Sequence, residues 1–250
     1  MALLPNTKQQ LTTLIGLPSI SSTLDEYDLS NQKVIEQLAS WCETLGFKID
    51  IQCVDEKRKK YNLMATLGRG PGGLILSGHT DTVPCNENRW NSDPFTLTEK
   101  NDRFYGLGSC DMKGFFPLVL AAVASIDKNK LKAPIFILAT SDEETSMQGA
   151  RTLATLGLPK ARAAIIGEPT GLSPINMHKG IMMESVRITG QAGHSSNPDL
   201  GNNAMEAMHS VISELMDYRT ELQNQYSHSG FSVPTPTLNL GCIHGGDNPN

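Results

Sequence analysis

Three short apolar runs in this chain each end within a few residues of a side chain that can bind a metal ion. The side chains that follow the runs at 73–78, 134–140 and 163–167 are His79, then Asp142, Glu143 and Glu144, and then Glu168. Apolar runs of this length predict strands buried on both faces of a sheet. Ligands of open α/β sheets collect beyond the carboxyl ends of the strands, so we expect these side chains to converge at one edge.

A glycine-rich loop at 106–114 adds a further acid, Asp111, just ahead of an apolar stretch. An Asp in that place could simply be the N-cap of a helix. The glycines on either side favour close backbone approach or unusual dihedrals instead. A carboxylate has two oxygens, so Asp111 is suited to bridge two metal ions about 3.5 to 4 Å apart.

His79 could be a capped or core histidine at the end of a strand. Asp81 follows two residues later, and its carboxylate could accept the second imidazole N–H and so fix the tautomer of a metal-binding histidine. Glu168 could be an exposed turn residue before Pro169. Because the other acids are expected at the same edge of the sheet, we favour metal binding for both His79 and Glu168.

Glu143 and Glu144 also have a structural interpretation, because Ser141 and Glu144 match a capping box. That pattern accounts for one glutamate only. Adjacent acids at a strand end can have different roles: one binds a metal ion, and its neighbour accepts a proton from water. His194 lies in the glycine-flanked run 193–196, which on spacing alone indicates a turn.

The bulk composition narrows the class of protein. A net charge of -5 argues against a nucleic-acid partner, and we interpret the basic cluster at 57–60 as a solvated connection. No apolar run approaches the roughly 18 to 20 residues of a membrane span, so we expect no membrane partner. The five cysteines are odd in number, widely spaced and without a C-x-x-C pair, which indicates a reducing, cytoplasmic location.

Periodicity predicts an alternating order of helices and strands and hence an α/β fold, with a mixed, mostly parallel sheet flanked by helices. The expected helices cover residues 28–45, 112–126 (limited by Pro117), 147–156 and 201–222. The expected strands cover residues 47–53, 62–67, 74–77, 135–140, 163–166, 180–189 and 237–243. We place the first domain at 1–177 and a smaller α+β domain at 178–250.

Five motifs taken together resemble the co-catalytic metallopeptidase family that includes aminoacylases and desuccinylases. They lie at 79–81, 108–114, 142–144, 167–170 and 193–196. Within the family, the runs at 111–116, 142–147 and 236–241 are most similar to the acetylornithine deacetylases. The resemblance covers essentially the whole chain and implies a metallopeptidase catalytic domain followed by a dimerisation domain.

The resemblance also implies a role for each candidate. His79, Asp111 and Glu168 would hold one metal ion, and Asp111 and Glu144 a second, the ions being zinc or cobalt. Glu143 would be the general base and Asp81 the orienting acid. His194 would reach the active site of a neighbouring subunit in a homodimer, where it would stabilise an oxyanion.

The implied reaction is hydrolysis of N2-acetyl-L-ornithine to acetate and L-ornithine, in arginine biosynthesis. Two alternatives stay open: a related hydrolase of N-acyl amino acids or dipeptides, and a non-catalytic metal-binding protein that associates with itself. Members of the family carry a last metal-binding histidine in a carboxyl-terminal segment that has no match here. We therefore expect the 250-residue chain to be a fragment with little or no activity by itself.

Overall fold

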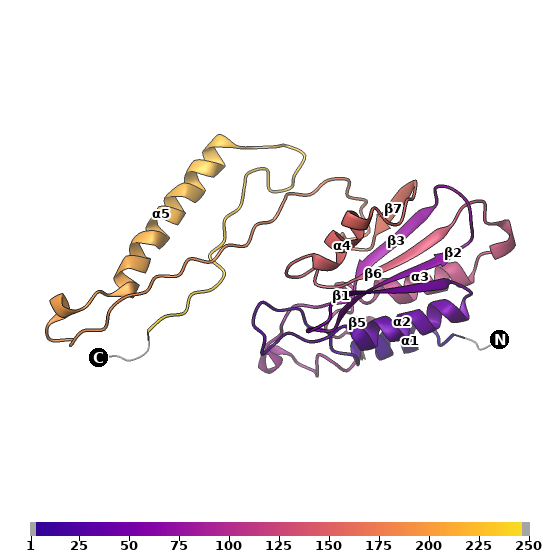
Figure 1. Cartoon of the computed structure of the whole chain (residues 1–250), viewed down its shortest axis with the longest axis horizontal. Coiled ribbons are helices and arrows are strands. Elements are labelled where there is room, and N and C mark those ends of the chain that lie inside the picture. The colour runs from indigo at the N-terminus through magenta and orange to yellow at the C-terminus, as the bar shows by residue number, and fades with distance from the viewer. Residues whose placement is uncertain (1–3, 247–250) are drawn as a thin grey trace. The chain divides into compact units, whose positions relative to one another are not determined.

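The computed structural model describes residues 4–246, which form two units (Figure 1). The first unit ends at Ser173 and the second begins at Pro174. This division falls four residues before the boundary predicted after residue 177. The assignment of the two units to catalysis and dimerisation stays a prediction.

A five-stranded sheet in the order β1-β2-β6-β3-β7 forms the centre of the first unit. Its strands are β1 (Lys48–Asp55), β2 (Lys60–Leu67), β3 (Leu74–His79), β6 (Ile135–Thr140) and β7 (Ala163–Ile166). β3 pairs in parallel with both β6 and β7, whereas β1 with β2 and β2 with β6 are antiparallel. The expected mixed sheet is confirmed, and its three parallel strands are the ones that precede the candidate ligands.

Three helices cover one face of this sheet: α1 (Thr7–Ile15), α2 (Gln32–Thr44) and α3 (Phe115–Ala124). Alternate residues of β2, namely Leu63, Ala65 and Leu67, point to this face and belong to one apolar core with these helices. α3 begins two residues before Pro117, as the limit set by that proline predicts.

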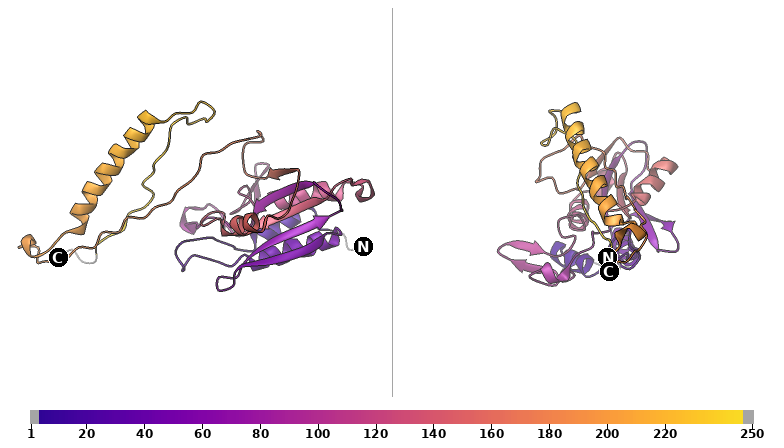
Figure 2. Two further views of the ribbon diagram at one scale, coloured as in Figure 1. Left: turned by 45° about the horizontal axis from the view of Figure 1, so that its top comes forward. Right: turned by 90° about the vertical axis from the view of Figure 1, so that its left-hand side faces the viewer.

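Helix α4 (Gln148–Leu156) covers the opposite face of β1 and β2, as Figure 2 also shows. Asn62 points to this side, since it alternates with Leu63 along β2, and its Nδ2 donates to the carbonyl oxygen of Gly149 at 2.9 Å. The sheet is therefore covered by helices on both faces, as expected for an α/β fold.

The helix predicted at 28–45 corresponds to α2, and its predicted start at residue 28 was wrong. α2 begins at Gln32 because Asn31 is engaged in contacts outside the helix. Its Nδ2 donates to the Tyr61 carbonyl and to Thr80 Oγ1, each at 2.8 Å, and its Oδ1 accepts from the Tyr61 N–H. Elements that were not predicted are helix α1, the hairpin of β4 (Thr98–Lys100) with β5 (Arg103–Tyr105), and 3-10 turns at Glu87–Arg89 and Lys128–Lys130.

The second unit contains helix α5 (Ala204–Gln225) and a 3-10 turn at Pro198–Leu200. The strands predicted at 180–189 and 237–243 are wrong. Among residues 174–246 the only described strand pairing is an isolated bridge between Gln191 and Asn202, and no described side chain there is buried. A strand needs a hydrogen-bonded partner and a covered face, and neither run has them.

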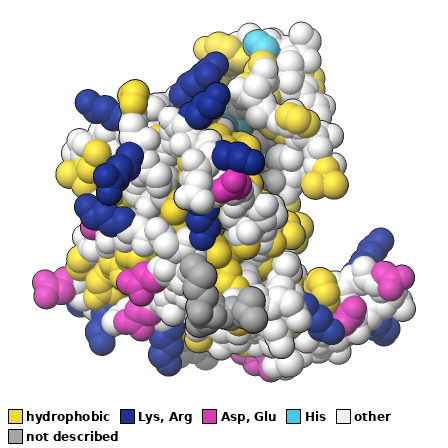
Figure 3. Space-filling model, turned by 90° about the vertical axis from the view of Figure 1, so that its right-hand side faces the viewer, with side chains coloured by type: hydrophobic (Ala, Val, Ile, Leu, Met, Phe, Trp, Pro, Cys, Tyr) yellow, Lys and Arg dark blue, Asp and Glu magenta, His cyan; other side chains and the backbone are white. Residues whose placement is uncertain are grey.

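The described residues include no helix that combines the length and the apolar character needed to cross a lipid bilayer. On the face drawn in Figure 3, lysine and arginine side chains are scattered among acidic, hydrophobic and uncharged side chains.

Candidate metal centre

The structure brings five of the predicted residues together at the carboxyl ends of the parallel strands. His79 is the last residue of β3, while Glu143 and Glu144 follow β6 and Glu168 follows β7. His79 and Thr140, the last residues of β3 and β6, lie side by side in the ladder. Asp111 comes from the glycine-rich loop before α3. This convergence follows from the parallel register of β3, β6 and β7.

Two overlapping sets of ligand atoms share His79. The first ligand group is His79, Asp111 and Glu168, and the second is His79, Glu143 and Glu144. Within each group the three ligand atoms lie within 4.8 Å of one another. One imidazole nitrogen binds one metal ion, so the two groups are alternatives for the same nitrogen rather than two complete sites.

The tautomer of His79 is set by its surroundings. Nδ1 lies 3.0 Å from the main-chain oxygen of Asp81, and because a carbonyl only accepts, Nδ1 must carry the proton. Nε2 faces three carboxylates: it is 3.1 Å from Asp111 and 3.8 Å from both Glu143 and Glu168. With the proton on Nδ1, a neutral Nε2 would be an acceptor 3.1 Å from another acceptor, Asp111 Oδ1. This contact requires a proton or another cation at Nε2.

Asp81 therefore contributes differently from the expectation. Its main-chain oxygen, rather than its carboxylate, is the acceptor for His79, since the carboxylate Oδ1 is 3.6 Å from Nδ1. Oδ2 accepts the main-chain N–H of Glu144 at 3.0 Å, whereas Oδ1 is buried without a hydrogen-bond partner. Burial raises the pKa of Asp81, which His79 and the main-chain N–H groups of Glu144 and Glu143 partly oppose.

Burial and the close spacing of negative charges raise the pKa values of two acids of the cluster, Glu144 and Glu168. Burial, followed by repulsion from Asp111, Glu143 and Asp81, raises the pKa of Glu144 to about 7, against the opposing attraction of His79. The pKa of Glu168 is raised by burial and by the same neighbours.

The same negative charges also raise the pKa of His79, although burial acts on an imidazole in the opposite direction. Burial alone lowers its pKa, but the carboxylates of Asp81, Glu143, Glu168 and Asp111 outweigh burial and raise it. The raised pKa values mean that the cluster of carboxylates favours the uptake of positive charge. A bound divalent cation would supply that charge in place of protons.

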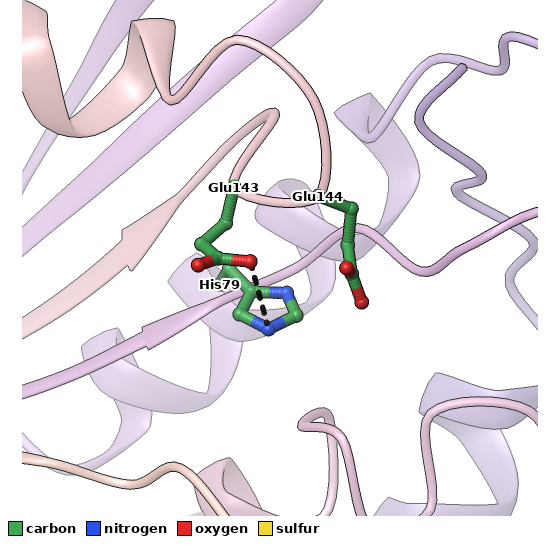
Figure 4. Close-up of side chains that lie close together, drawn as sticks. All are labelled: His79, Glu143 and Glu144. Carbon is green, nitrogen blue, oxygen red and sulfur yellow. Dashed lines mark ion pairs between the residues drawn. The ribbon is translucent and has the colours of Figure 1, made fainter. Parts of the chain in front are cut away.

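Glu143 and Glu144 stand on a turn rather than on the first turn of a helix (Figure 4). The capping box expected as an alternative does not form, because α4 begins only at Gln148 and its N-cap residue is Met147. Both side chains are half-buried. In Figure 4 the carboxylate of Glu143 is joined to the ring of His79 by the dashed line that marks their ion pair.

Asp111 is not a helix cap, because the N-cap residue of α3 is Gly114. Its side chain is about half exposed (51%). Gly108 has φ +83°, and a Cβ there would lie 2.9 Å from Thr82 Cγ2, so the loop requires glycine at this position. The unusual dihedral expected for this loop is therefore present. Asp111 and Glu144 line one pocket of about 270 Å³ together with Trp90.

His194 lies in the second unit. Its Nδ1 accepts from the main-chain N–H of Ser196 at 3.2 Å and lies 2.8 Å from Ser196 Oγ, in a turn. The turn predicted from spacing is thus observed. The role of His194 at a neighbouring subunit stays a prediction.

The sequence interpretation missed two buried lysines beside the cluster, Lys60 and Lys113, each 1% exposed. Lys60 was assigned with its neighbours to a solvated connection, which is wrong for Lys60 because it is the first residue of β2 and its ammonium group meets acids of other segments. Lys113 donates to the carbonyl oxygens of Leu14 and Leu17. No spacing signal distinguishes a buried lysine from an exposed one.

The donor set fits a divalent metal centre. One imidazole and four carboxylates offer the nitrogen and oxygen ligands that zinc and similar ions take. All five cysteines are free, and none lies in either ligand group. The orientation of Nε2 toward three acids is the observation that fits a cation best.

The fold and the cluster at the strand ends place this chain among the α/β proteins with a candidate divalent-metal centre. The model of "Peptidase family M20/M25/M40" matches residues 75–240, and the chain belongs to this family.

The resemblance to acetylornithine deacetylases is also confirmed. The chain is 53% identical over 247 residues to "Acetylornithine deacetylase" of Proteus mirabilis and 52% identical over 247 residues to that of Aliivibrio salmonicida. Both alignments cover 99% of this chain, but only 64% and 65% of the relatives. The chain thus spans slightly less than two thirds of the length of these curated relatives.

Two crystal structures show the same fold at low identity. A tripeptidase from Staphylococcus aureus has a TM-score of 0.59 at 17% identity, covering 98% of this chain and 62% of its own. Human carnosine dipeptidase 1 has a TM-score of 0.54 at 20% identity, covering 64% of this chain and 37% of its own.

Proposed function

We propose that this protein is a metal-dependent amidohydrolase that cleaves N2-acetyl-L-ornithine to acetate and L-ornithine. The single observation that carries the hydrolase proposal is the arrangement around His79 Nε2, which faces Asp111, Glu143 and Glu168 within 3.8 Å. The acetylornithine substrate rests on relatives of that name at 52 and 53% identity.

His79, Asp111 and Glu168 would hold one divalent ion, and Asp111 and Glu144 a second. Asp111 and Glu144 line the same pocket, which supports the proposal that they bind the same ion. When bound, the ions supply Lewis acidity that lowers the pKa of water to about 7 and polarises an acyl oxygen. Zinc or cobalt is proposed, because mixed nitrogen and oxygen ligands suit both.

Glu143 is the proposed general base. Its side chain is 36% exposed, so water reaches it, while its Oε2 lies at the edge of the cluster. The carboxylate accepts one proton of the attacking water as the oxygen bonds to the acetyl carbon. The same proton then passes from Glu143 to the amine nitrogen as the C–N bond breaks, which yields acetate and ornithine.

Asp81 is the proposed orienting residue, acting through two contacts. Its main-chain oxygen fixes the His79 tautomer, and its carboxylate holds the main-chain N–H of Glu144. Both contacts keep ligand side chains in place before any ion binds.

A homodimer formed through residues 178–250, with His194 reaching the partner's active site, is part of the same proposal. It is supported by the family resemblance of the run 193–196. The proposed role in arginine biosynthesis and the proposed cytoplasmic location follow from the substrate and from five free cysteines.

The test measures ornithine release by the full-length protein as metal is added stepwise to metal-free enzyme. N2-acetyl-L-ornithine is compared with a succinylated diamine and a dipeptide. Release of ornithine in proportion to bound metal supports the proposal, whereas preference for either competitor assigns the site to another substrate of the family. Metal binding without hydrolysis of any of them supports the non-catalytic alternative.

Glu143→Gln separates the general base from the ligands. The amide keeps the size of the side chain but cannot accept the proton, so we expect at least a 100-fold loss of turnover with the metal content preserved. A variant that retains most of its turnover contradicts the role of Glu143.

A further inference from the structure

Lys60 is the centre of a buried ionic cluster behind the Glu143 and Glu144 turn. Its side chain is 1% exposed, and its ammonium group has three close partners. It donates to Asp28 Oδ1 at 2.8 Å, to the Leu29 carbonyl oxygen at 2.9 Å, and it lies 2.9 Å from Asp142 Oδ1. The ammonium group thus makes two hydrogen bonds, to Asp28 and Leu29, and an ion pair with Asp142.

The contact with Asp142 joins Lys60 to the turn that carries the two glutamates. Asp142 is the residue directly before Glu143, and its side chain is only 12% exposed. Ser21 Oγ donates to the same Asp142 oxygen at 3.1 Å and lies 2.7 Å from Thr145 Oγ1. The carboxylate of Asp142 is thus held from two segments remote in sequence.

Asp142 needs this support because its backbone is left-handed. It has φ +55°, which is uncommon for any residue other than glycine. Its carbonyl oxygen accepts the N–H of Met147 at 2.6 Å, which closes the turn across Glu143 and Glu144. A left-handed residue that persists requires the surroundings to determine it.

The turn has a second anchor on its other side. Asp81 Oδ2 accepts the N–H of Glu144 at 3.0 Å, and the main-chain oxygen of the same Asp81 orients His79. Lys60 therefore fixes the start of the turn and Asp81 fixes its middle. Between these two anchors the side chains of Glu143 and Glu144 face His79.

We propose that Lys60 is a positioning residue for the metal centre, which through its ion pair with Asp142 holds the turn that presents Glu143 and Glu144. The inference rests on the proposed function in that these glutamates are taken as the base and a metal ligand. The described partners of the Lys60 ammonium are Asp28, Leu29 and Asp142, and none of them is a proposed metal ligand.

The test compares two matched substitutions of the partners of Lys60 in the full-length protein. Asp142→Asn and Asp28→Asn each remove one carboxylate charge from the same ammonium with little change of shape. Only Asp142 belongs to the turn. Lys60→Met is the third variant, and circular dichroism with thermal unfolding establishes that each variant is folded.

Hydrogen exchange, measured without metal, reports the turn directly. We expect the N–H groups of Glu144 and Met147 to exchange at least tenfold faster in Asp142→Asn than in Asp28→Asn. Equal protection of these two groups in both variants overturns the proposal, because Lys60 would then contribute only to stability. This readout holds even if Lys60→Met does not fold.

Zinc affinity, measured by competition with a chelator, reports the consequence for the site. Supporting residues of metal ligands typically change affinity about 10- to 100-fold, so we expect a loss of at least tenfold in Asp142→Asn but not in Asp28→Asn. An unchanged affinity in Asp142→Asn also overturns the proposal. If the wild-type protein binds no zinc, the proposed function fails, whereas faster exchange in Asp142→Asn than in Asp28→Asn would still show that the charge of Asp142 holds the turn.

Discussion

Zinc affinity should fall steeply between pH 8 and pH 6, and Glu144→Gln should remove part of this dependence. Burial and the neighbouring acids raise the pKa of Glu144 to about 7. A metal ion binds the ionised carboxylate, so protons compete with the metal over this range. The sign follows from the raised pKa: affinity is lost as pH falls.

The magnitude can be worked from that pKa. A carboxyl group with a pKa of about 7 is roughly nine-tenths ionised at pH 8 and one-tenth ionised at pH 6. Glu144 alone therefore lowers affinity by up to about tenfold, and its partial exposure to water makes this an upper value. His79, whose pKa is also raised, must lose a proton from Nε2 to bind metal and adds to the wild-type dependence.

The assay is competition with a chelator of known proton affinity at pH 8, 7 and 6 and constant ionic strength. Glu144→Gln should bind more weakly at pH 8 and lose up to about tenfold less affinity by pH 6. Glu99→Gln is the control, since Glu99 pairs with Lys8 at the surface. Parallel pH profiles for wild type and Glu144→Gln would refute proton competition at Glu144.

Two further predictions concern stability. Burial lowers the pKa of Lys113 from 10.5 to about 8, so between these values the unfolded chain binds a proton that the folded chain does not. The wild-type advantage over Lys113→Met in unfolding free energy should therefore grow from pH 8 to pH 10.5 in urea titrations, and a constant difference would contradict burial as the cause. Gly167→Ala would place a Cβ 2.2 Å from the ring of Phe115 and should cost about 1 to 3 kcal/mol, so unchanged urea unfolding would show that the ring moves aside freely.

The strands were predictable where burial decides the local sequence. The runs that became β3 and β6 begin with the apolar residues 74–76 and 135–139, as expected for central strands of a sheet. The order of the strands was not predictable in the same way. The antiparallel insertion of β2 beside β6 depends on pairing between residues that lie from 68 (Leu67 and Ile135) to 76 (Leu63 and Ala139) positions apart, which periodicity does not encode.

Local helix signals gave less reliable results at the site. Ser141 and Glu144 have the spacing of a capping box, yet no helix begins there. A capping box requires the residues after the cap to enter the helical region, and Asp142 is left-handed instead. The contacts that hold it there come from Ser21 and Lys60, which no window around residue 141 contains.

The sequence presents Asp142, Glu143 and Glu144 as equivalent acids, but folding separates them. The acid nearest the end of β6 turns inward to Lys60 and is 12% exposed, whereas Glu143 remains 36% exposed beside His79. Burying Asp142 is tolerable only because a buried ammonium neutralises it. That ammonium lies at the start of β2, adjacent to β6 in the sheet, so the strand order itself supplies the charge that fixes the turn. Asp142 thus supports the site structurally and leaves the next two acids free for chemistry.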